Sequence, residues 1–141
     1  MDLDALSAQM QIVTGLRRYA YAIDDRDFDT VRSLFTADAT LDYRASSGPI
    51  GPVDTVVDWI EQGLGMVGPT QHLLSNEVVD VGGSQATSRC YMLNPLLSPE
   101  DPPSNVLLLG GEYRDQWRRT PDGWRIANRV HVVTWTRSMP S

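Results

Sequence analysis

Apolar residues recur at steps of three and four over residues 3–24, which is the spacing of one face of an amphipathic helix. Tyr19 lies three residues after Leu16 and four before Ile23, so the same face carries this tyrosine. The pattern predicts a long first helix that turns this face toward the core. The predicted apolar positions are Leu3, Leu6, Met10, Val13, Leu16, Ala20 and Ile23.

Two shorter helices are expected after the first. A helix at about 27–36 would begin at Asp27, because a carboxylate accepts hydrogen bonds from the free amides of a first turn. Pro52 fits the first position of a third helix. Residues 39–43 alternate like a strand between these helices. The apolar stripe of the third helix comprises Val53, Val56, Val57, Ile60 and Leu64.

From residue 70 onward the hydrophobic period changes to two, which is typical of strands. Helices followed by long antiparallel strands indicate an α+β fold, and a strongly bent sheet wrapped around the helices would leave a pocket between them. No repeat or linker interrupts the chain, so residues 1–141 are predicted to form one domain. The expected strands cover about 70–80, 84–97, 105–119 and 124–137, with turns at 82–83 and 121–123.

Composition excludes several classes of function. The net charge is −6 and all twelve cations are arginines, so a Schiff-base lysine and a P-loop lysine are both absent. The acidic balance argues against a nucleic-acid partner. No apolar run approaches the ~20 residues that span a bilayer, and the acidic start of the chain lacks the order of a signal peptide. A soluble cytoplasmic protein without a membrane partner is expected.

Cysteine and histidine content is low. Cys90 is the single cysteine, so an intrachain disulfide is excluded, and its place in an alternating strand is typical of a small core residue. His72 and His131 are the two histidines, and neither has a second ligand at helical spacing. Neither a metal nor another cofactor is expected. Proton transfer by side chains is the chemistry that remains.

Asp24 and His72 are the first candidates for that chemistry. The neighbouring acids Asp25, Asp27 and Asp29 lie at or before a helix start, whereas Asp24 falls in the last turn of the first helix. The helix dipole disfavours an anion there, so the carboxylate needs a donor, and a histidine N–H would serve. An imidazole changes charge near neutral pH, and a carboxylate partner fixes its tautomer. A mostly apolar strand face, suited to a pocket wall, would surround His72 with Thr70, Leu74, Asn76 and Val78.

Four other residues are weaker candidates. Tyr19 would either donate its hydroxyl to a substrate oxygen or pack in the core, and Tyr43 has the same alternatives. Asn94 ends an alternating face of small and apolar residues and would orient a ligand or cap the strand. His131 alternates with Arg129, and the pattern leaves open whether it points inward.

Several segments together resemble the SnoaL-like branch of the NTF2-like superfamily. The first are residues 18–29 (RYAYAIDDRDFD), 34–39 (LFTADA) and 41–44 (LDYR), and the resemblance continues in order along nearly the whole chain. It implies a cone-shaped α+β barrel around a deep apolar pocket. The later segments are TQH at 70–72, ATSR at 86–89, GGEY at 110–113 and DGWRI at 122–126.

The nearest subgroup contains scytalone dehydratase, bile acid 7α-dehydratase and hexachlorocyclohexane dehydrochlorinase. The resemblance implies that His72 is the base and that Asp24 orients it. Tyr19 matches a catalytic tyrosine of the bile acid enzyme, and Tyr43 resembles a water-binding tyrosine of scytalone dehydratase. Asn94 stands where the bile acid enzyme has an acid and Val133 where it has an arginine, so the implied substrates do not carry over.

These observations predict a cofactor-independent lyase, a dehydratase acting on a small apolar polycyclic or polyketide-like molecule of secondary metabolism. His72, Asp24 and Tyr19 would be catalytic, while Tyr43, Asn94 and His131 would bind substrate. An isomerase or cyclase would use the same residues. A non-catalytic binding protein or a structural small subunit is the alternative of a different class. The resemblance also implies a homotrimer, with a homodimer as the alternative.

Overall fold

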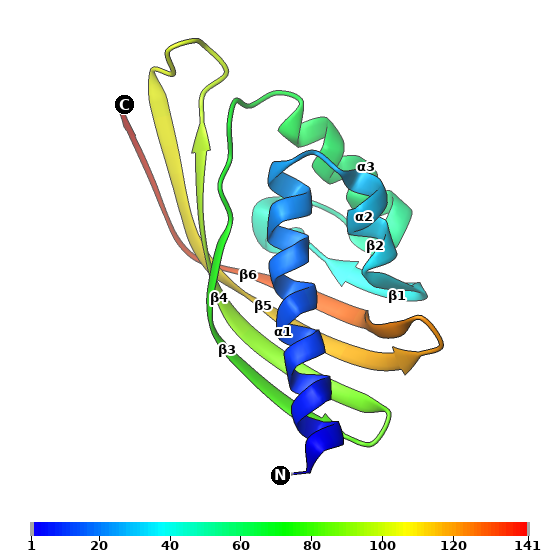
Figure 1. Ribbon diagram of the computed structural model, residues 1–141. Helices are drawn as coiled ribbons and strands as arrows, with labels where there is room; N and C mark the ends of the chain where they lie inside the picture. Colours follow the sequence, from blue (N-terminus) through cyan, green and yellow to red (C-terminus); the bar gives the residue numbers. More distant parts are fainter. Residues whose placement is uncertain (1, 141) are drawn as a thin grey trace.

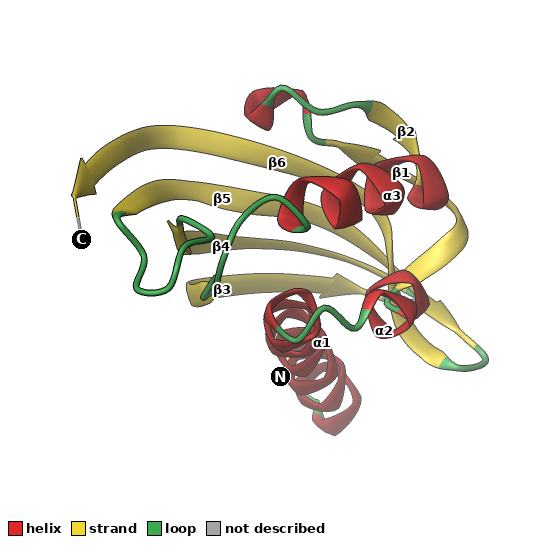
Figure 2. Cartoon of the chain, turned by 90° about the horizontal axis from the view of Figure 1, so that it is seen from above, coloured by secondary structure: helices red, strands yellow, loops and turns green. Residues whose placement is uncertain are grey.

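A strongly curved sheet partly encloses the helices on its concave side (Figures 1 and 2). The computed structural model describes residues 2–140, and within them the six strands follow the order β2-β1-β6-β5-β4-β3. The β1–β6 pair is parallel and the other neighbours are antiparallel. The predicted α+β class is confirmed. The sheet curls without closing, so the expected barrel is an open one.

The helices and strands follow the predicted order, with one added strand. The helices are α1 (Leu3–Asp24), α2 (Phe28–Ser33) and α3 (Val53–Leu64), with a short 3-10 helix η1 (Arg44–Ser46). The strands are β1 (Phe35–Asp42), β2 (Ile50–Pro52), β3 (Leu73–Gly82), β4 (Gln85–Leu97), β5 (Asn105–Thr120) and β6 (Gly123–Pro140). Strand β2 has three residues, too few for an alternation to reveal it in the sequence.

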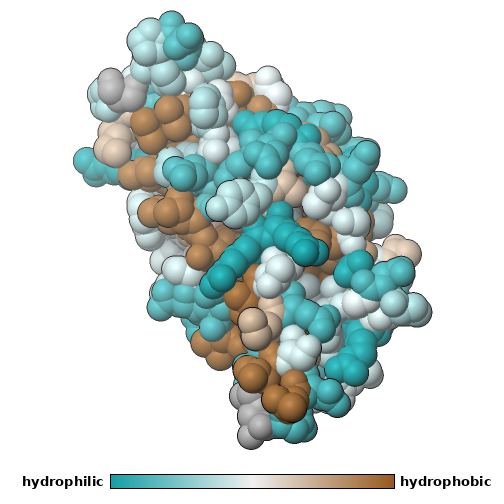
Figure 3. Space-filling view, in the orientation of Figure 1, coloured by the Kyte–Doolittle hydropathy of each residue, from teal (hydrophilic) through white to brown (hydrophobic). Residues whose placement is uncertain are grey.

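Helix α1 begins where Asp2 accepts a hydrogen bond from the Ala5 amide at 2.7 Å. Its buried face contains Tyr19 and the C-terminal part of the predicted stripe, but near the start of the helix the predicted stripe does not coincide with the buried side. The expected core positions Leu3, Leu6 and Met10 are therefore exposed, and apolar surface gathers at this end of the molecule in Figure 3. Ala8 and Ile12 face the core in their place. Within residues 2–140 no helix has the length and apolar character to cross a bilayer.

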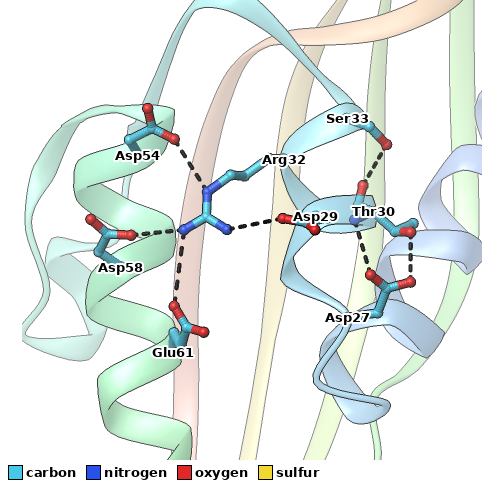
Figure 4. A network of polar contacts seen from close by, with 8 residues as sticks. All are labelled: Asp27, Asp29, Thr30, Arg32, Ser33, Asp54, Asp58 and Glu61. Atoms are coloured by element: carbon cyan, nitrogen blue, oxygen red, sulfur yellow. Dashed lines mark hydrogen bonds and ion pairs between the residues drawn. The ribbon is translucent and has the colours of Figure 1, made fainter.

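Helices α2 and α3 are joined by an arginine (Figure 4). Arg32 of α2 donates to Asp58 at 2.7 Å and to Asp54 at 3.2 Å, both on α3. These acids are well exposed, so each pair contributes less than ~1 kcal/mol. Asp27 caps α2 as predicted, since it accepts from the Thr30 amide. Pro52 is the N-cap of α3 and not its first residue.

Strand β3 contains an irregularity that changes which residues face inward. The pairing with β4 shifts between Ser75 and Val78, and Asn76 adopts a left-handed φ of 58°. Beyond this bulge Glu77 and Val79 are the more buried positions, while Val78 is 61% exposed. The expected face that joined His72 to Asn76 and Val78 is therefore wrong after Leu74. An inserted residue interrupts the alternation, so the residues after it face the opposite side of the sheet.

The concave face of the long strands supplies most of the core and the walls of the site. On β4 the buried residues alternate as expected, from Ala86 through Cys90 to Asn94. Burial raises the pKa of the Cys90 thiol to about 11, so this residue is an inert core cysteine at neutral pH. Trp117 of β5 donates to Ser88 of β4 at 2.8 Å and is buried in the core.

Candidate active site

Asp24 and His72 meet at the end of α1. His72 lies directly before β3, and its Nδ1 is 2.7 Å from Oδ1 of Asp24. The backbone amide of His72 donates to the other carboxylate oxygen, also at 2.7 Å. The predicted pair is therefore formed, through two contacts that fix both the imidazole and the backbone that carries it.

Two further residues support the pair. The hydroxyl of Thr70 donates to Oδ1 of Asp24 at 2.9 Å. Arg26 follows α1 in a left-handed conformation (φ 60°), and its guanidinium donates to the Thr70 hydroxyl at 2.8 Å and to the Gly68 carbonyl at 3.0 Å. Arg26 thus binds the end of α1 to the segment that precedes β3, and this contact sets the position of His72.

Asp24 is ionised at neutral pH. Burial favours the neutral acid, but the hydrogen bonds from His72 and Thr70 together outweigh it and hold the pKa of Asp24 below its usual value. A carboxylate only accepts hydrogen bonds, so Nδ1 of His72 carries the proton. Nε2 then has a free lone pair, and no hydrogen bond within residues 2–140 occupies it. His72 is thereby prepared to accept a proton.

His72 lines an apolar cavity of about 220 Å³ between the sheet and helices α1 and α3. An enclosed space of ~150 Å³ is enough for benzene, so the volume suits a compact molecule of one or two rings. Asp24 is not part of this wall and contacts the cavity only through His72. The lining consists of Tyr19, Ile23, Tyr43, Ser46, Trp59, Ile60, Gly63, Leu64, His72, Met92, Asn94, Leu96, Leu109, Tyr113 and His131.

Tyr19 and Tyr43 form a hydroxyl pair in the wall of the cavity. Their oxygens are 2.6 Å apart, and both side chains are buried. Burial raises the pKa of each tyrosine far above its usual value, so both keep their protons at neutral pH. Tyr19 also forms a side-chain hydrogen bond with Tyr113, which lines the same cavity, so the three hydroxyls form one cluster. A chain of two hydrogen bonds among three hydroxyls leaves one proton for a ligand oxygen. The structure thus brings both sequence-predicted tyrosines to the cavity that contains His72.

His131 points inward, which settles the orientation that the alternation left open. Its Nε2 is 2.8 Å from the Ser46 hydroxyl, and its ring stacks on Tyr43 with centroids 5.0 Å apart. Burial, together with the nearby Arg129, lowers the pKa of His131 to about 4, so the ring is neutral at physiological pH. Its Nδ1 is buried without a hydrogen-bond partner in the described chain.

Asn94 is the remaining predicted binding residue, and it also reaches the cavity from β4. Its side-chain Oδ1 is buried and has no hydrogen-bond partner among residues 2–140. A buried polar atom without a partner costs ~1–3 kcal/mol, which a ligand would recover by bonding to it. Asn94 and His131 thus line a largely apolar wall, and each has one buried polar atom without a partner in the described chain.

One buried ion pair behind the tyrosines was not expected from the sequence. Arg129 of β6 donates to both carboxylate oxygens of Asp115 on β5, at 2.8 and 2.9 Å, and both side chains are 0% exposed. The Arg129 guanidinium lies over the rings of Tyr19 and Tyr113. The sequence signal was the alternation itself, since Asp115 shares its strand face with Tyr113 and Trp117.

The arrangement supports proton transfer by side chains. Within residues 2–140 no group of three or more His, Cys, Asp or Glu side chains gathers to hold a metal ion. His72, the two tyrosines, Asn94 and His131 all line one cavity. A ligand there can lose a proton to His72 while its oxygen receives a hydrogen bond from the tyrosines.

The chain is similar in sequence to a known domain family and to an uncharacterized mycobacterial protein. Residues 4–130 match the SnoaL-like domain. Rv2910c, an uncharacterized protein of Mycobacterium tuberculosis strain H37Rv, is 39% identical over 139 residues, which is 99% of this chain and 94% of that protein.

Two solved structures share the fold at low sequence identity. One, from Novosphingobium aromaticivorans and named as a candidate scytalone dehydratase, has a TM-score of 0.83 and 22% identity over 94% of this chain and 87% of its own. The hexachlorocyclohexane dehydrochlorinase LinA-type3 of Novosphingobium barchaimii has a TM-score of 0.85 and 14% identity over 99% and 94%. At these identities the likeness establishes the shared fold.

Proposed function

Because this chain belongs to the SnoaL-like domain family, we propose that it is a cofactor-independent lyase, a dehydratase of small, largely apolar ring compounds of the polyketide type. The observation that carries the proposal is the Asp24–His72 pair, whose free Nε2 is at the wall of an apolar cavity. The names of two proteins with the same fold, a candidate scytalone dehydratase and a dehydrochlorinase, support an elimination.

The substrate would carry a carbonyl group and a hydroxyl group on the second carbon from it. Nε2 of His72 removes a proton from the carbon between them, and the electron pair of the broken C–H bond moves to the carbonyl oxygen as an enolate. The enolate then re-forms the carbonyl and a C=C bond while the C–O bond to the hydroxyl breaks. The proton on His72 passes to the leaving hydroxide, which departs as water.

Asp24 and the tyrosines have separate tasks in this reaction. Asp24 holds the tautomer that leaves Nε2 free, and its negative charge stabilises the imidazolium that forms. The free O–H of the cluster formed by Tyr19, Tyr43 and Tyr113 donates a hydrogen bond to the enolate oxygen and keeps its proton. General-base catalysis supplies ~10²–10⁴-fold, so hydrogen bonding to the oxygen and positioning in the cavity must supply the remainder.

Asn94 and His131 would orient the substrate. The unpartnered Oδ1 of Asn94 accepts a hydrogen bond from a hydroxyl, and the neutral His131 offers its free Nδ1 to another polar group. Among residues 2–140, the side chains that line the cavity include no unpaired charge, which favours a neutral substrate over a carboxylate. The preferred ligand is thus apolar in its body and carries two or more oxygens at its edge.

Product mass distinguishes this proposal from its closest alternative. An isomerase or a cyclase would use the same residues but would leave the substrate mass unchanged. The purified protein is incubated with a panel of hydroxylated one- and two-ring ketones, and the masses of the products are measured by mass spectrometry. Loss of one water that depends on His72 supports the dehydratase. Turnover at unchanged mass, or binding without turnover across the panel, contradicts it.

A further inference from the structure

The buried ion pair of Arg129 and Asp115 needs an explanation beyond stability. Both side chains are fully buried in the sheet core behind the cavity, and neither lines the cavity itself. A buried ion pair is often no more stabilising than apolar residues of the same size, because both charges lose their hydration. Its place directly behind the hydroxyl pair points to a role in the site.

The geometry turns the positive end of this pair toward the tyrosines. Asp115 accepts hydrogen bonds from Nε and Nη2 of Arg129, so it occupies one edge of the guanidinium. The flat face lies 4.2 Å from the ring centroid of Tyr19 and 4.0 Å from that of Tyr113. The third nitrogen, Nη1, is buried and has no hydrogen-bond partner in the described part of the chain.

The cation acts on every hydroxyl in this part of the wall. Burial is the main reason that the pKa values of Tyr19, Tyr43 and Tyr113 are raised, and Arg129 opposes that rise in all three. A positive charge in a low-dielectric core interacts strongly with any negative charge that forms nearby. Charge that a ligand shares with the Tyr19–Tyr43 hydroxyls would therefore be stabilised from behind by Arg129.

We propose that Arg129, held in place by Asp115, is a positioning residue that makes the Tyr19–Tyr43 pair a site for an oxyanion. The ligands selected by this site are neutral compounds that become an enolate or a phenolate inside the cavity. The inference rests on the proposed function, because that function generates an enolate oxygen. It extends the function by naming the charge that stabilises the oxygen and the chemical class that the site prefers.

The other titratable groups around the cavity do not supply this charge. His131 is neutral above pH 4 because burial lowers its pKa to about 4. His72 is the proposed base, so its Nε2 gains a proton only by taking it from the ligand. The Arg129–Asp115 pair is also neutral as a whole, but Asp115 lies at one edge of the guanidinium and the flat face is turned toward the tyrosines. Arg129 is therefore the cation that can favour an ionised ligand oxygen.

Binding of 4-nitrophenol tests the proposal, since its phenolate and phenol forms absorb at different wavelengths. The pKa of the bound phenol is measured by absorbance titration for wild type and for the double variant Arg129→Met/Asp115→Leu. Removing both charges together avoids leaving one buried and unpaired. The exposed pair of Arg118 and Asp38 provides the matched control, Arg118→Met/Asp38→Leu. Circular dichroism and thermal unfolding verify that each variant is folded.

The expected result is a bound phenol that ionises more readily than in water on the wild-type protein. In the Arg129→Met/Asp115→Leu variant its pKa should rise by about one unit, a ~10-fold loss of the ionised form, while the control variant behaves as wild type. Arg129→Lys, which retains the charge, should keep part of the preference. The proposal is overturned if wild type and the double variant prefer the phenolate form equally. It is also overturned if the wild-type protein binds only the neutral phenol, or binds neither form.

The same experiment separates this inference from the proposed function. His72→Ala removes the base but leaves the tyrosines and Arg129 in place, so the bound phenol should still be ionised. Loss of dehydratase turnover in His72→Ala without loss of phenolate preference is the result that both proposals predict. Full turnover in a folded His72→Ala protein, with the preference retained, would contradict the proposed reaction and would not affect the oxyanion site. Turnover that persists while the preference is absent would contradict the oxyanion site alone.

Discussion

Nδ1 of His72 lies 2.7 Å from Oδ1 of Asp24, although 48 positions separate the two residues in the chain. Asp24 closes the first helix, and His72 precedes the first long strand. The contact therefore depends on the docking of α1 against the sheet and not on any local turn. The proposed proton transfer depends on this contact.

Replacing His72 by alanine should reduce kcat by ~10²–10⁴-fold, the usual contribution of a general base. The side chain makes one hydrogen bond, to Asp24, so the fold should persist. Turnover of an identified substrate and circular dichroism are the two measurements. Gln71→Ala, at the exposed neighbouring position, is the control that should keep full activity. A folded His72→Ala protein with wild-type kcat would contradict the assignment of His72 as the general base.

Replacing Asp24 by asparagine should lower kcat by at least ~10², even though the side chain keeps its size. An asparagine amide donates to Nδ1 and so favours the tautomer with its proton on Nε2, which cannot act as a base. Asp25→Asn, one residue further and exposed, is the matched control. Equal losses in both variants would show that charge at the helix end, and not the contact with His72, is what matters.

Asp24 should also make stability depend on pH. Its folded pKa lies below the unfolded value of ~3.9, so the unfolded chain binds its proton first as the pH falls. The stability that Asp24 contributes is therefore complete above about pH 5 and is lost as the pH drops through the folded pKa. Urea unfolding of wild type and Asp24→Asn should show a difference that shrinks below ~pH 4. A constant difference over the acidic range would contradict the charged contact.

His131 should cause a further loss of stability with falling pH, at milder pH than Asp24. Its folded pKa of about 4 lies below the ordinary value of 6.5. Between pH 6.5 and pH 4 the unfolded state therefore binds a proton at this residue, whereas the folded state does not. Stability should fall by up to ~3 kcal/mol as the pH drops from 6.5 to 4, and it should level off below. His131→Gln removes the titrating group, so urea unfolding of this variant should lack that part of the slope. If the variant keeps the wild-type dependence of stability on pH, another group causes the loss of stability between pH 6.5 and pH 4.

The hydroxyl pair can be dissected with phenylalanine. Removing one donor from an oxyanion site typically costs ~10²–10³ in kcat, and Tyr19→Phe or Tyr43→Phe should approach that range. Either loss breaks the 2.6 Å bond between the hydroxyls while the ring still fills the core. Tyr21→Phe, on the exposed side of α1, should have no effect. A change in KM with kcat preserved would assign the pair to substrate binding alone.

The outer face of the sheet bears on the predicted homotrimer. Tyr91, Leu93 and Trp135 are large apolar residues exposed on the long strands, as expected of a face that is covered in an assembly. We expect light scattering to give three chain masses, and Trp135→Glu to shift the mass toward one. A homodimer would support the alternative drawn from the resemblance, whereas a wild-type monomer at high concentration would contradict self-association.

Most of the site was readable from the sequence because its residues stand out from their local patterns. Asp24 is an acid at the wrong end of a helix, and that conflict predicted a donor. The inward orientation of Tyr19 followed from its spacing to Leu16 and Ile23. Helix α1 and the four long strands followed from their hydrophobic periods.

The features that escaped prediction depend on tertiary structure. The bulge in β3 reverses its faces between Ser75 and Val78, and nothing local marks it. Arg129 and Asp115 are charged residues at inward positions, and each is tolerable only because the other is present on the next strand. Thr70 and Ser46 complete hydrogen bonds whose partners become neighbours after folding.

Arg26 links the folding of this protein to the proposed activity. Its guanidinium ties the end of α1 to the Gly68 carbonyl and the Thr70 hydroxyl, and this connection places Asp24 against His72. A partly unfolded molecule can keep the helix and the sheet hairpins, but it has no base while this connection is open. Turnover therefore reports the fraction of molecules in which helix and sheet are docked. An activity assay in denaturant should lose signal before far-ultraviolet circular dichroism does.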